Sequence, residues 1–540
     1  MAAVQKPIDQ TISPDSPSVE PHRARILDEP AVWSGRRALL ALLVATALLY
    51  GAGLGRTDFW APDEPRYGAI AEEMRSFRHG LSGLFLLHLN DVPYTQKPPL
   101  YFWLAAALGV PFERVHEVTA RLPSALAGLF CVGLTAWIGR LLFRQLLPAI
   151  LAAGLLATSF RFAFTARRAQ LDVLLTAFEL AAIAIFLYLE FRRGGVENAR
   201  RFPLAVAGLH ASLGAAALTK GPVGWLPLLI FAAYLAWEGR FGAMRAIVPV
   251  WSWALSLAPV TAWIGTAIAL APPGFAEVAV GENLIGRFFA GTSHARPFYY
   301  FARQAPLDFM PWSLLLPFSV PVLWRFAKAA EHDAEPSGAT AFRSAARFLI
   351  VWVGVPLLFF SLSAGKRGVY LLPSFPALAL ICVLIGSQAT GFGSLSKPLL
   401  RRITVALLTV AAIELALFTL ALPLLHEEKS PRPIAVAATR YTNAGEGIGV
   451  FGMRSLEGGI AYYGDRRVVS LGDDAELRDF LESGGRFVIL RDRQLDSFGD
   501  RLDLRAVERF RSGRRRLALA QHVSESHPHE TLLESSIEVD

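Results

Sequence analysis

Cysteine and charged side chains are both scarce in this chain of 540 residues. The two cysteines fall inside apolar runs, which excludes a disulfide framework and a cysteine-ligated metal site. Charged residues make up 18% of the chain against 53% hydrophobic residues, and the mean hydropathy is +0.39. A soluble protein could not bury so much apolar surface beneath so few charges. The net charge of +8 is modest for this length, and we interpret it as loops facing anionic lipid, with no nucleic acid as partner.

Residues 1–35 also contain no apolar run like the core of a signal peptide. Residues 1–35 are polar and contain prolines, so we expect a disordered cytoplasmic tail. After them, apolar runs of 17 or more residues recur, the length needed to cross about 30 Å of hydrocarbon. We predict spans at 37–55, 121–143, 146–166, 173–191, 203–218, 223–238, 246–271, 306–326, 348–364, 368–387 and 403–423. The run 98–112 fits either a short span or a segment lying at the interface.

The distribution of basic residues favours a cytoplasmic N-terminus. If 98–112 does not cross, most short loops rich in arginine and lysine fall inside, as the positive-inside rule requires. The opposite face also holds basic residues, so the count alone does not decide the topology. If 98–112 did cross, however, the downstream loops would invert and the pattern would break. We therefore predict eleven full spans and one interfacial segment, or about 11–13 transmembrane helices in all.

This topology divides the chain into four parts. Residues 36–423 form the transmembrane domain, in which 56–120 is the first periplasmic loop. Residues 424–520 alternate short apolar strands, at 447–451 and 486–490, with a charged helical pattern at 475–483, which predicts a small soluble α/β domain in the periplasm. Residues 521–540 are expected to be disordered.

A compact group of charges lies in the first loop. The pair Asp63-Glu64 follows the first apolar segment, and Lys97 stands at the head of the run 98–112. Charges grouped at a membrane rim often form a functional site. The alternative for the acidic pair is an N-terminal cap of the next helix, with Pro65 at its first position. Both roles are compatible, because capping would fix the carboxylates in place.

The residues after this pair have helical spacing. Apolar side chains recur on one face of the expected helix at Tyr67, Ile70, Met74 and Phe77. We therefore expect an amphipathic helix lying on the bilayer surface.

Three other charged residues each allow two interpretations. Lys97, near Tyr94, is either a snorkelling anchor or a point charge for a lipid-linked phosphate. Asp172, in the block ARRAQLD, is either a helix cap or a site residue. Lys220, in LTKGP, either marks a turn between two spans or binds phosphate.

Seven sequence blocks occur in an order that resembles a known family: DEPRY, HLNDVPYTQKPPLYFW, ARLPSALAG, ARRAQLD, TKGP, ENLIGRF and KRGVYLLPSFPALAL. Together they resemble the integral-membrane glycosyltransferases with the GT-C fold, above all the lipid A aminoarabinose transferases and the protein O-mannosyltransferases. The resemblance implies an α-helical polytopic fold. It also implies inverting transfer of one sugar from a polyprenyl-phosphate donor to an envelope lipid, glycan or protein, at the periplasmic face of the bacterial inner membrane.

The resemblance also implies roles for single residues. Asp63, beside Glu64, matches the family's first-loop catalytic carboxylate, and Asp172 matches its second acidic position. The expected substrate-binding residues are Lys97, Arg66, Tyr94, Arg287, Tyr370 and Lys220. Members of this branch generally need no metal at the catalytic centre, so neither a metal nor another cofactor is expected. Gln96 stands where aminoarabinose transferases usually have glutamate, so the acidic group expected beside an amino sugar is missing.

Two other classes share some of these features. A lipid-linked sugar transporter or flippase would also have many spans and cations for a lipid phosphate. It would not need Asp63 and Asp172 on one face, and it would more often show inverted repeats, which we do not find in this sequence. A non-catalytic scaffold whose C-terminal domain binds cell-wall material is the third class. We predict the glycosyltransferase.

Overall fold

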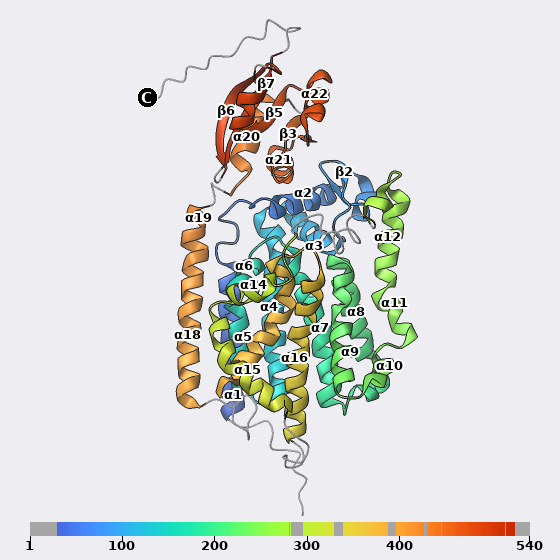
Figure 1. Cartoon of the computed structure of the whole chain (residues 1–540), viewed down its shortest axis with the longest axis vertical. Coiled ribbons are helices and arrows are strands. Elements are labelled where there is room, and N and C mark those ends of the chain that lie inside the picture. The colour runs from blue at the N-terminus through green and yellow to red at the C-terminus, as the bar shows by residue number, and fades with distance from the viewer. Residues whose placement is uncertain are drawn as a thin grey trace, which may run out of the picture.

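The protein has a helical body and a C-terminal region that contains a sheet (Figure 1). The computed structural model describes residues 30–279, 281, 295–328, 338–386, 396–425, 429–443, 445–499, 501–512 and 515–523. The C-terminal region lies on one end of the body, next to α2 (Asp63–Arg75) (Figure 1). Most of the two tails expected to be disordered, 1–35 and 521–540, lies outside the described residues.

The body is built almost entirely from helices. Besides α2 they are α1 (Pro30–Gly51), α3 (Leu100–Gly109), α4 (Glu117–Phe143), α5 (Leu146–Ala157), α6 (Phe160–Ala166), α7 (Leu171–Arg192), α8 (Pro203–Lys220), α9 (Leu226–Trp237), α10 (Met244–Ile247), α11 (Trp253–Ser256), α12 (Ala258–Leu270), α14 (Tyr300–Asp308), α15 (Leu316–Lys328), α16 (Gly338–Leu362), α17 (Phe375–Cys382), α18 (Lys397–Ala416) and α19 (Leu422–Leu424). Short 3-10 turns join several of them, including η3 (Val196–Arg201), η6 (Val250–Ser252) and η10 (Gly368–Ser374). The first loop also forms a small hairpin from β1 (His88–Leu89) and β2 (Val92–Pro93).

Most of the predicted spans are present as helices. Among the described residues, five helices are long and apolar enough to cross a membrane: Glu117–Phe143, Leu171–Arg192, Ala341–Leu362, Gly368–Ile385 and Lys397–Leu424. Three bent pairs raise this number to eight if each pair is one span: Leu146–Ala157 with Phe160–Ala166, Val250–Ser256 with Ala258–Leu270, and Tyr300–Asp308 with Trp312–Lys328. All eight coincide with predicted spans.

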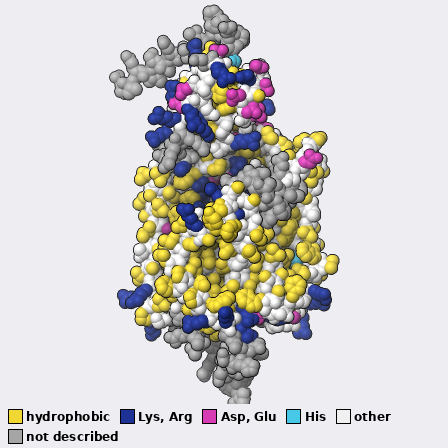
Figure 2. Space-filling model, in the orientation of Figure 1, with side chains coloured by type: hydrophobic (Ala, Val, Ile, Leu, Met, Phe, Trp, Pro, Cys, Tyr) yellow, Lys and Arg dark blue, Asp and Glu magenta, His cyan; other side chains and the backbone are white. Residues whose placement is uncertain are grey.

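Three predicted spans do not meet the same criteria. Among the described residues, α1, α8 and α9, which correspond to the predicted spans 37–55, 203–218 and 223–238, are not counted as candidate spans by length and composition, so that these three segments cross the membrane stays a prediction. The run 98–112 forms a helix over Leu100–Phe112, which is shorter than the spans above. That it lies at the interface stays a prediction. Figure 2 shows a broad apolar waist with lysine and arginine gathered toward both ends, as expected for a protein that spans a membrane.

Close helix contacts hold the body together. At Gly139 of α4, an added Cβ would lie 2.9 Å from the Cα of Ala149 in α5. Small residues of this kind let membrane helices approach and pack by van der Waals contact. The span α7 is buried over most of its length and packs between α4 and α8. It therefore provides a fixed scaffold for the charged residue near its first turn, Asp172.

The helix α2 is not the surface helix that the sequence predicted. Ten of its 13 residues are buried, because α3 packs on one side and the C-terminal helix α21 (Glu457–Gly464) on another. Tyr67, Ile70 and Met74 are buried as the spacing predicted. Phe77 lies beyond the helix end, at a φ of 51°, and is exposed. The amphipathic pattern was correct, but a protein domain covers the face that was expected to meet water.

The C-terminal region has α/β architecture, and its predicted strands and helix are confirmed in position. The five-stranded sheet has the order β4 (Val468–Leu471), β3 (Ile448–Phe451), β5 (Phe487–Arg491), β7 (Arg515–His522) and β6 (Leu504–Ser512). The first three strands are parallel, and β7 and β6 extend them as an antiparallel hairpin. Side chains of alternate strand residues pack with α20 (Arg432–Tyr441) and α21 on one face, and with α22 (Asp474–Glu482) and α23 (Asp492–Phe498) on the other.

The C-terminal region is bonded directly to the first loop. The side chain of Asn90, in the hairpin turn, donates to the carbonyl of Val468 and accepts from its N–H at 2.9 Å. The hydroxyl of Tyr463 accepts from the N–H of Phe59 at 2.7 Å and contacts Glu117 at 2.7 Å. These bonds fix α21 on top of α2.

Candidate active site

The carboxylate of Asp63 lies between two guanidinium groups at the start of α2. Arg66, one helical turn later, pairs with Oδ1, and Arg367 pairs with Oδ2 at 2.8 Å. The Asp63 side chain is 7% exposed, whereas those of Arg66 and Arg367 are 24% and 38% exposed. Burial alone would raise the pKa of Asp63, but the charges of Arg367 and Arg66 outweigh it and lower the pKa below its ordinary value of 3.8. Asp63 is therefore ionised at neutral pH.

Glu64 has a different environment, although it is the next residue. Its side chain is 1% exposed and pairs with Arg121 at 2.9 Å and Arg168 at 3.2 Å. The backbone N–H groups of Trp60 and Ala169 also donate to it, at 2.9 and 2.8 Å. Despite complete burial, these partners lower the pKa of Glu64 to about 2. A carboxylate with every oxygen occupied joins three segments of the fold and leaves no lone pair for a substrate.

A second charged group forms where α7 begins and α8 ends. The ammonium of Lys220, the last residue of α8, pairs with Oδ1 of Asp172. The same ammonium lies 4.7 Å from the ring centroid of Tyr370, a cation–π contact. Three of the predicted site residues are thus in direct contact, although they come from three separate parts of the sequence.

Arg367 connects the two groups. It pairs with Asp63 and is also within electrostatic range of Asp172. Its carbonyl accepts from the N–H of Tyr370 at 3.0 Å, so the same turn, η10, places both side chains. Figure 2 shows basic side chains in the hollow between the C-terminal region and the body. Asp63 and Asp172 therefore share one cluster, as the predicted topology requires.

The remaining predicted site residues have separate outcomes. Tyr94 is buried and is within electrostatic range of Arg66, which places it beside the cluster. Lys97 is half-buried directly before α3, and its role as a phosphate ligand stays a prediction. Arg287 lies outside the described residues.

Neither acidic residue caps its helix. The N-cap of α2 is Pro62 and that of α7 is Gln170, and neither makes a side-chain capping bond. The helix α2 begins at Asp63 itself, two residues earlier than the predicted start at Pro65. Both carboxylates are directed to arginine or lysine partners, so the cap interpretation was wrong for both.

Arg367 was not among the predicted site residues. It lies in the block KRGVYLLPSFPALAL, where only Tyr370 was selected. The adjacent pair Lys366-Arg367, at the start of an apolar segment on the same predicted face as Asp63, was the available signal. Arg121 was missed as well, because nothing local marks it as the partner of Glu64.

One group of described residues has the composition of a metal site. Glu73, His79 and Asp91 each place a ligand atom within 4.8 Å of the others. Nε2 of His79 lies 3.1 Å from Glu73 and 3.4 Å from Asp91, and Arg78 pairs with Asp91 at 3.0 Å. These contacts tie α2 to the hairpin of the first loop.

The sequence is similar to two groups of known proteins. The family described as dolichyl-phosphate-mannose-protein mannosyltransferase (PMT) matches residues 36–276. An undecaprenyl phosphate-alpha-4-amino-4-deoxy-L-arabinose arabinosyl transferase of Pseudomonas fluorescens is 31% identical over 64% of this chain and 57% of its own length. The corresponding enzyme of Erwinia tasmaniensis is 27% identical over 70% of this chain and 65% of its own length. The matched regions thus span less than two thirds of these relatives.

Solved structures show the same fold. ArnT from Cupriavidus metallidurans, in a crystal structure with bound undecaprenyl phosphate, has a TM-score of 0.69 at 21% identity and covers 92% of this chain and 99% of its own. An oligosaccharyltransferase from Archaeoglobus fulgidus has a TM-score of 0.52 at 13% identity and covers 85% of this chain and 69% of its own. The likeness to ArnT extends over the body and the C-terminal region together.

Proposed function

We propose that this chain, which is similar to the aminoarabinose transferases and the protein O-mannosyltransferases and has the same fold as ArnT, transfers one sugar from a polyprenyl-phosphate donor to an envelope acceptor. The acceptor is a lipid A-type glycolipid, a glycan or a protein. The observation that carries the proposal is the position of Asp63, an ionised carboxylate between two partly exposed guanidinium groups. Such a site offers a base and two anion ligands within one small volume.

The cations bind the donor phosphate in this proposal. When the acceptor oxygen bonds to the anomeric carbon, the bond from that carbon to the phosphate oxygen breaks and polyprenyl phosphate leaves. Negative charge grows on the phosphate during this step, so fixed cations stabilise the transition state more than the ground state. Arg66, Arg367 and Lys220 are the described cations nearest to the two carboxylates, and Lys97 and Arg287 are further candidates from the resemblance.

Asp63 accepts the proton of an acceptor hydroxyl in this scheme. Without substrate its two arginine partners lower its pKa and make it a weak base. A donor phosphate that competes for Arg66 and Arg367 draws positive charge away from the carboxylate. The basicity of Asp63 then rises when the donor is bound. If the acceptor is already ionised, the same carboxylate orients it.

The topology follows from the same proposal. The chain is a multi-pass membrane protein, and we place it in the bacterial inner membrane with the site and the C-terminal region in the periplasm. The C-terminal region covers α2 and bonds to the first loop, so it lies on the same side as Asp63. The domains are then 36–423 for the transferase and 424–520 for the periplasmic α/β domain.

Purified protein in proteoliposomes with a radiolabelled polyprenyl-phosphate sugar tests the function. We expect label to pass to an acceptor, and Asp63→Asn to abolish the transfer while the protein still folds. Asp91→Asn is a matched control, because it removes a carboxylate from the same loop outside the cluster. Movement of the labelled lipid across the bilayer without transfer, or transfer at a near wild-type rate by Asp63→Asn, would contradict the proposal.

A further inference from the structure

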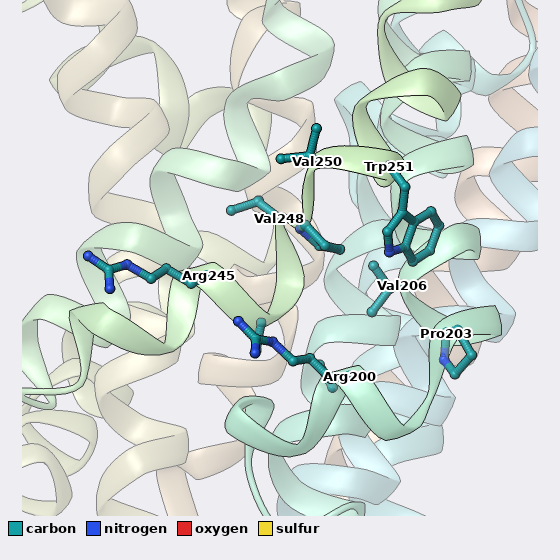
Figure 3. Close-up of a pocket in the computed structure, with 10 residues that line it drawn as sticks. Arg200, Pro203, Val206, Arg245, Val248, Val250 and Trp251 are labelled. Carbon is teal, nitrogen blue, oxygen red and sulfur yellow. The ribbon is translucent and has the colours of Figure 1, made fainter.

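A groove lies at the end of the body opposite to the candidate active site. Its cavity volume is about 600 Å³, and η3, α8, α10 and η6 line it with Arg200, Arg245, Val206, Val250 and Trp251 (Figure 3). The groove begins where α8 begins, at Pro203, whereas Lys220 at the other end of α8 pairs with Asp172. A helix of 18 residues is about 27 Å long, close to the thickness of a hydrocarbon core. The groove and the candidate site therefore lie at opposite ends of α8.

The walls of the groove are apolar and accessible. Val250 is 89% exposed and Trp251 is 49% exposed, although both are hydrophobic. Leu204, next to the groove on α8, is 87% exposed. Side chains of this kind at the end of membrane helices contact lipid, and tryptophan favours the headgroup level. Such exposed apolar side chains are suited to contact with acyl chains.

Two cationic side chains also line the groove. Arg200 and Arg245 are exposed, and neither forms an ion pair with any residue in the ranges that the structure describes. The carboxylates of Glu190 and Glu197 both pair with Arg240 instead. Figure 3 shows both arginine side chains on one side of the groove, with Trp251 on the other. An amphipathic anion could pair its charge with the arginines and place its apolar part against the hydrophobic side chains.

We propose that this groove binds an anionic glycerophospholipid of the leaflet opposite to the candidate active site. Arg200 and Arg245 contact the phosphodiester, and Val250 and Trp251 contact the first part of the acyl chains. Arginine suits phosphate because its planar guanidinium can donate two parallel hydrogen bonds. Basic pockets between membrane helices bind lipid headgroups in the same way. The proposal does not depend on the transferase activity, since it concerns a separate surface.

Binding is measured on the full-length protein in nanodiscs of phosphatidylcholine that contain increasing phosphatidylglycerol. We expect native mass spectrometry to show retained phosphatidylglycerol, and Arg200→Gln with Arg245→Gln to lower the apparent affinity roughly 25-fold, about fivefold for each charge. Arg401→Gln with Arg402→Gln is the matched control, because both arginines are exposed on α18 at the same end of the body (Figure 1). An equal loss of affinity in the control variant would mean that the lipid is attracted to the basic surface in general, and it would refute a binding site in the groove.

The apolar wall has its own test. Phosphatidylglycerol with brominated acyl chains should quench tryptophan fluorescence more than brominated phosphatidylcholine, and Trp251→Phe should remove the excess. Glycerol 3-phosphate in solution should not displace the lipid, because it lacks the chains. Equal quenching by both lipids, or full displacement by the soluble phosphate, would refute a phospholipid site.

Discussion

Replacing Glu64 by glutamine should lower the stability of the fold without directly affecting the transfer reaction. The carboxylate is 1% exposed and Arg121, its main partner, is 3% exposed. Glutamine keeps the shape but removes the charge, which leaves a buried guanidinium without its counter-ion. Breaking a buried ion pair in this way costs about 3–5 kcal/mol. A change of that size is large against the stability of a typical domain.

The lowered pKa of Glu64 indicates a contribution to stability of similar size. It falls from an ordinary value of 4.5 to about 2, which corresponds by linkage to about 3 kcal/mol of stability. Because the folded-state pKa is the lower one, this contribution is present above about pH 4.5 and is lost as the pH falls through about 2. The stability of Glu64→Gln should therefore depend less on pH in this acid range than that of the wild type.

Thermal unfolding in detergent and turnover per folded molecule together test this assignment. We expect Glu64→Gln to lower the unfolding temperature clearly, and to keep its turnover when that is normalised to the folded fraction. Asp63→Asn should show the reverse, with stability kept and turnover lost. If Glu64→Gln were as stable as the wild type but inactive, the carboxylate would belong to the chemistry and the reasoning would fail.

Three further changes test the site. Arg367→Gln should raise the pKa of Asp63 by removing a cation, so the acid limb of the pH profile of kcat/KM should move to higher pH, with a rate loss of about 10²–10³-fold. Gly458→Val should lower kcat by up to about 100-fold, because a Cβ at Gly458 would lie 2.5 Å from the Cα of Arg66; an unchanged kcat would show that α21 does not position α2. Lys97→Ala should weaken both donor affinity and kcat in steady-state kinetics, with partial rescue by arginine, whereas an effect on stability alone would make the lysine an anchor.

Much of the fold could be predicted because membrane helices leave a strong hydropathy pattern. Eight predicted spans match helices or bent pairs, and the strands at 448–451 and 487–491 were located to within a residue. The position of α2 could not be predicted. Its apolar face fits a bilayer surface as well as a protein interface, and only the tertiary contacts with α3 on one side and α21 on another decide between them.

The candidate site was partly predictable for a related reason. Asp63, Asp172, Lys220 and Tyr370 stand out locally as charged or aromatic residues at the ends of apolar segments. Which charge pairs with which depends on contacts between distant segments, and no local pattern carries that information. Their local pattern alone therefore does not separate Asp63 from Glu64. In the structure Glu64 forms a buried pair with Arg121, whereas Asp63 pairs with the partly exposed Arg367.

The two neighbouring carboxylates also differ in when their partners are synthesised. Glu64 meets Arg121 only 57 residues later in the chain, but Asp63 meets Arg367 after 304 residues. Since membrane proteins emerge from the ribosome N-terminus first, the pair that holds the first loop can form early, with only the first helices in place. The arrangement around Asp63 is completed only when the segment before α17 has inserted. A chain that stops short of this segment would have a folded first loop and an incomplete site, so truncated products of this protein should be inert.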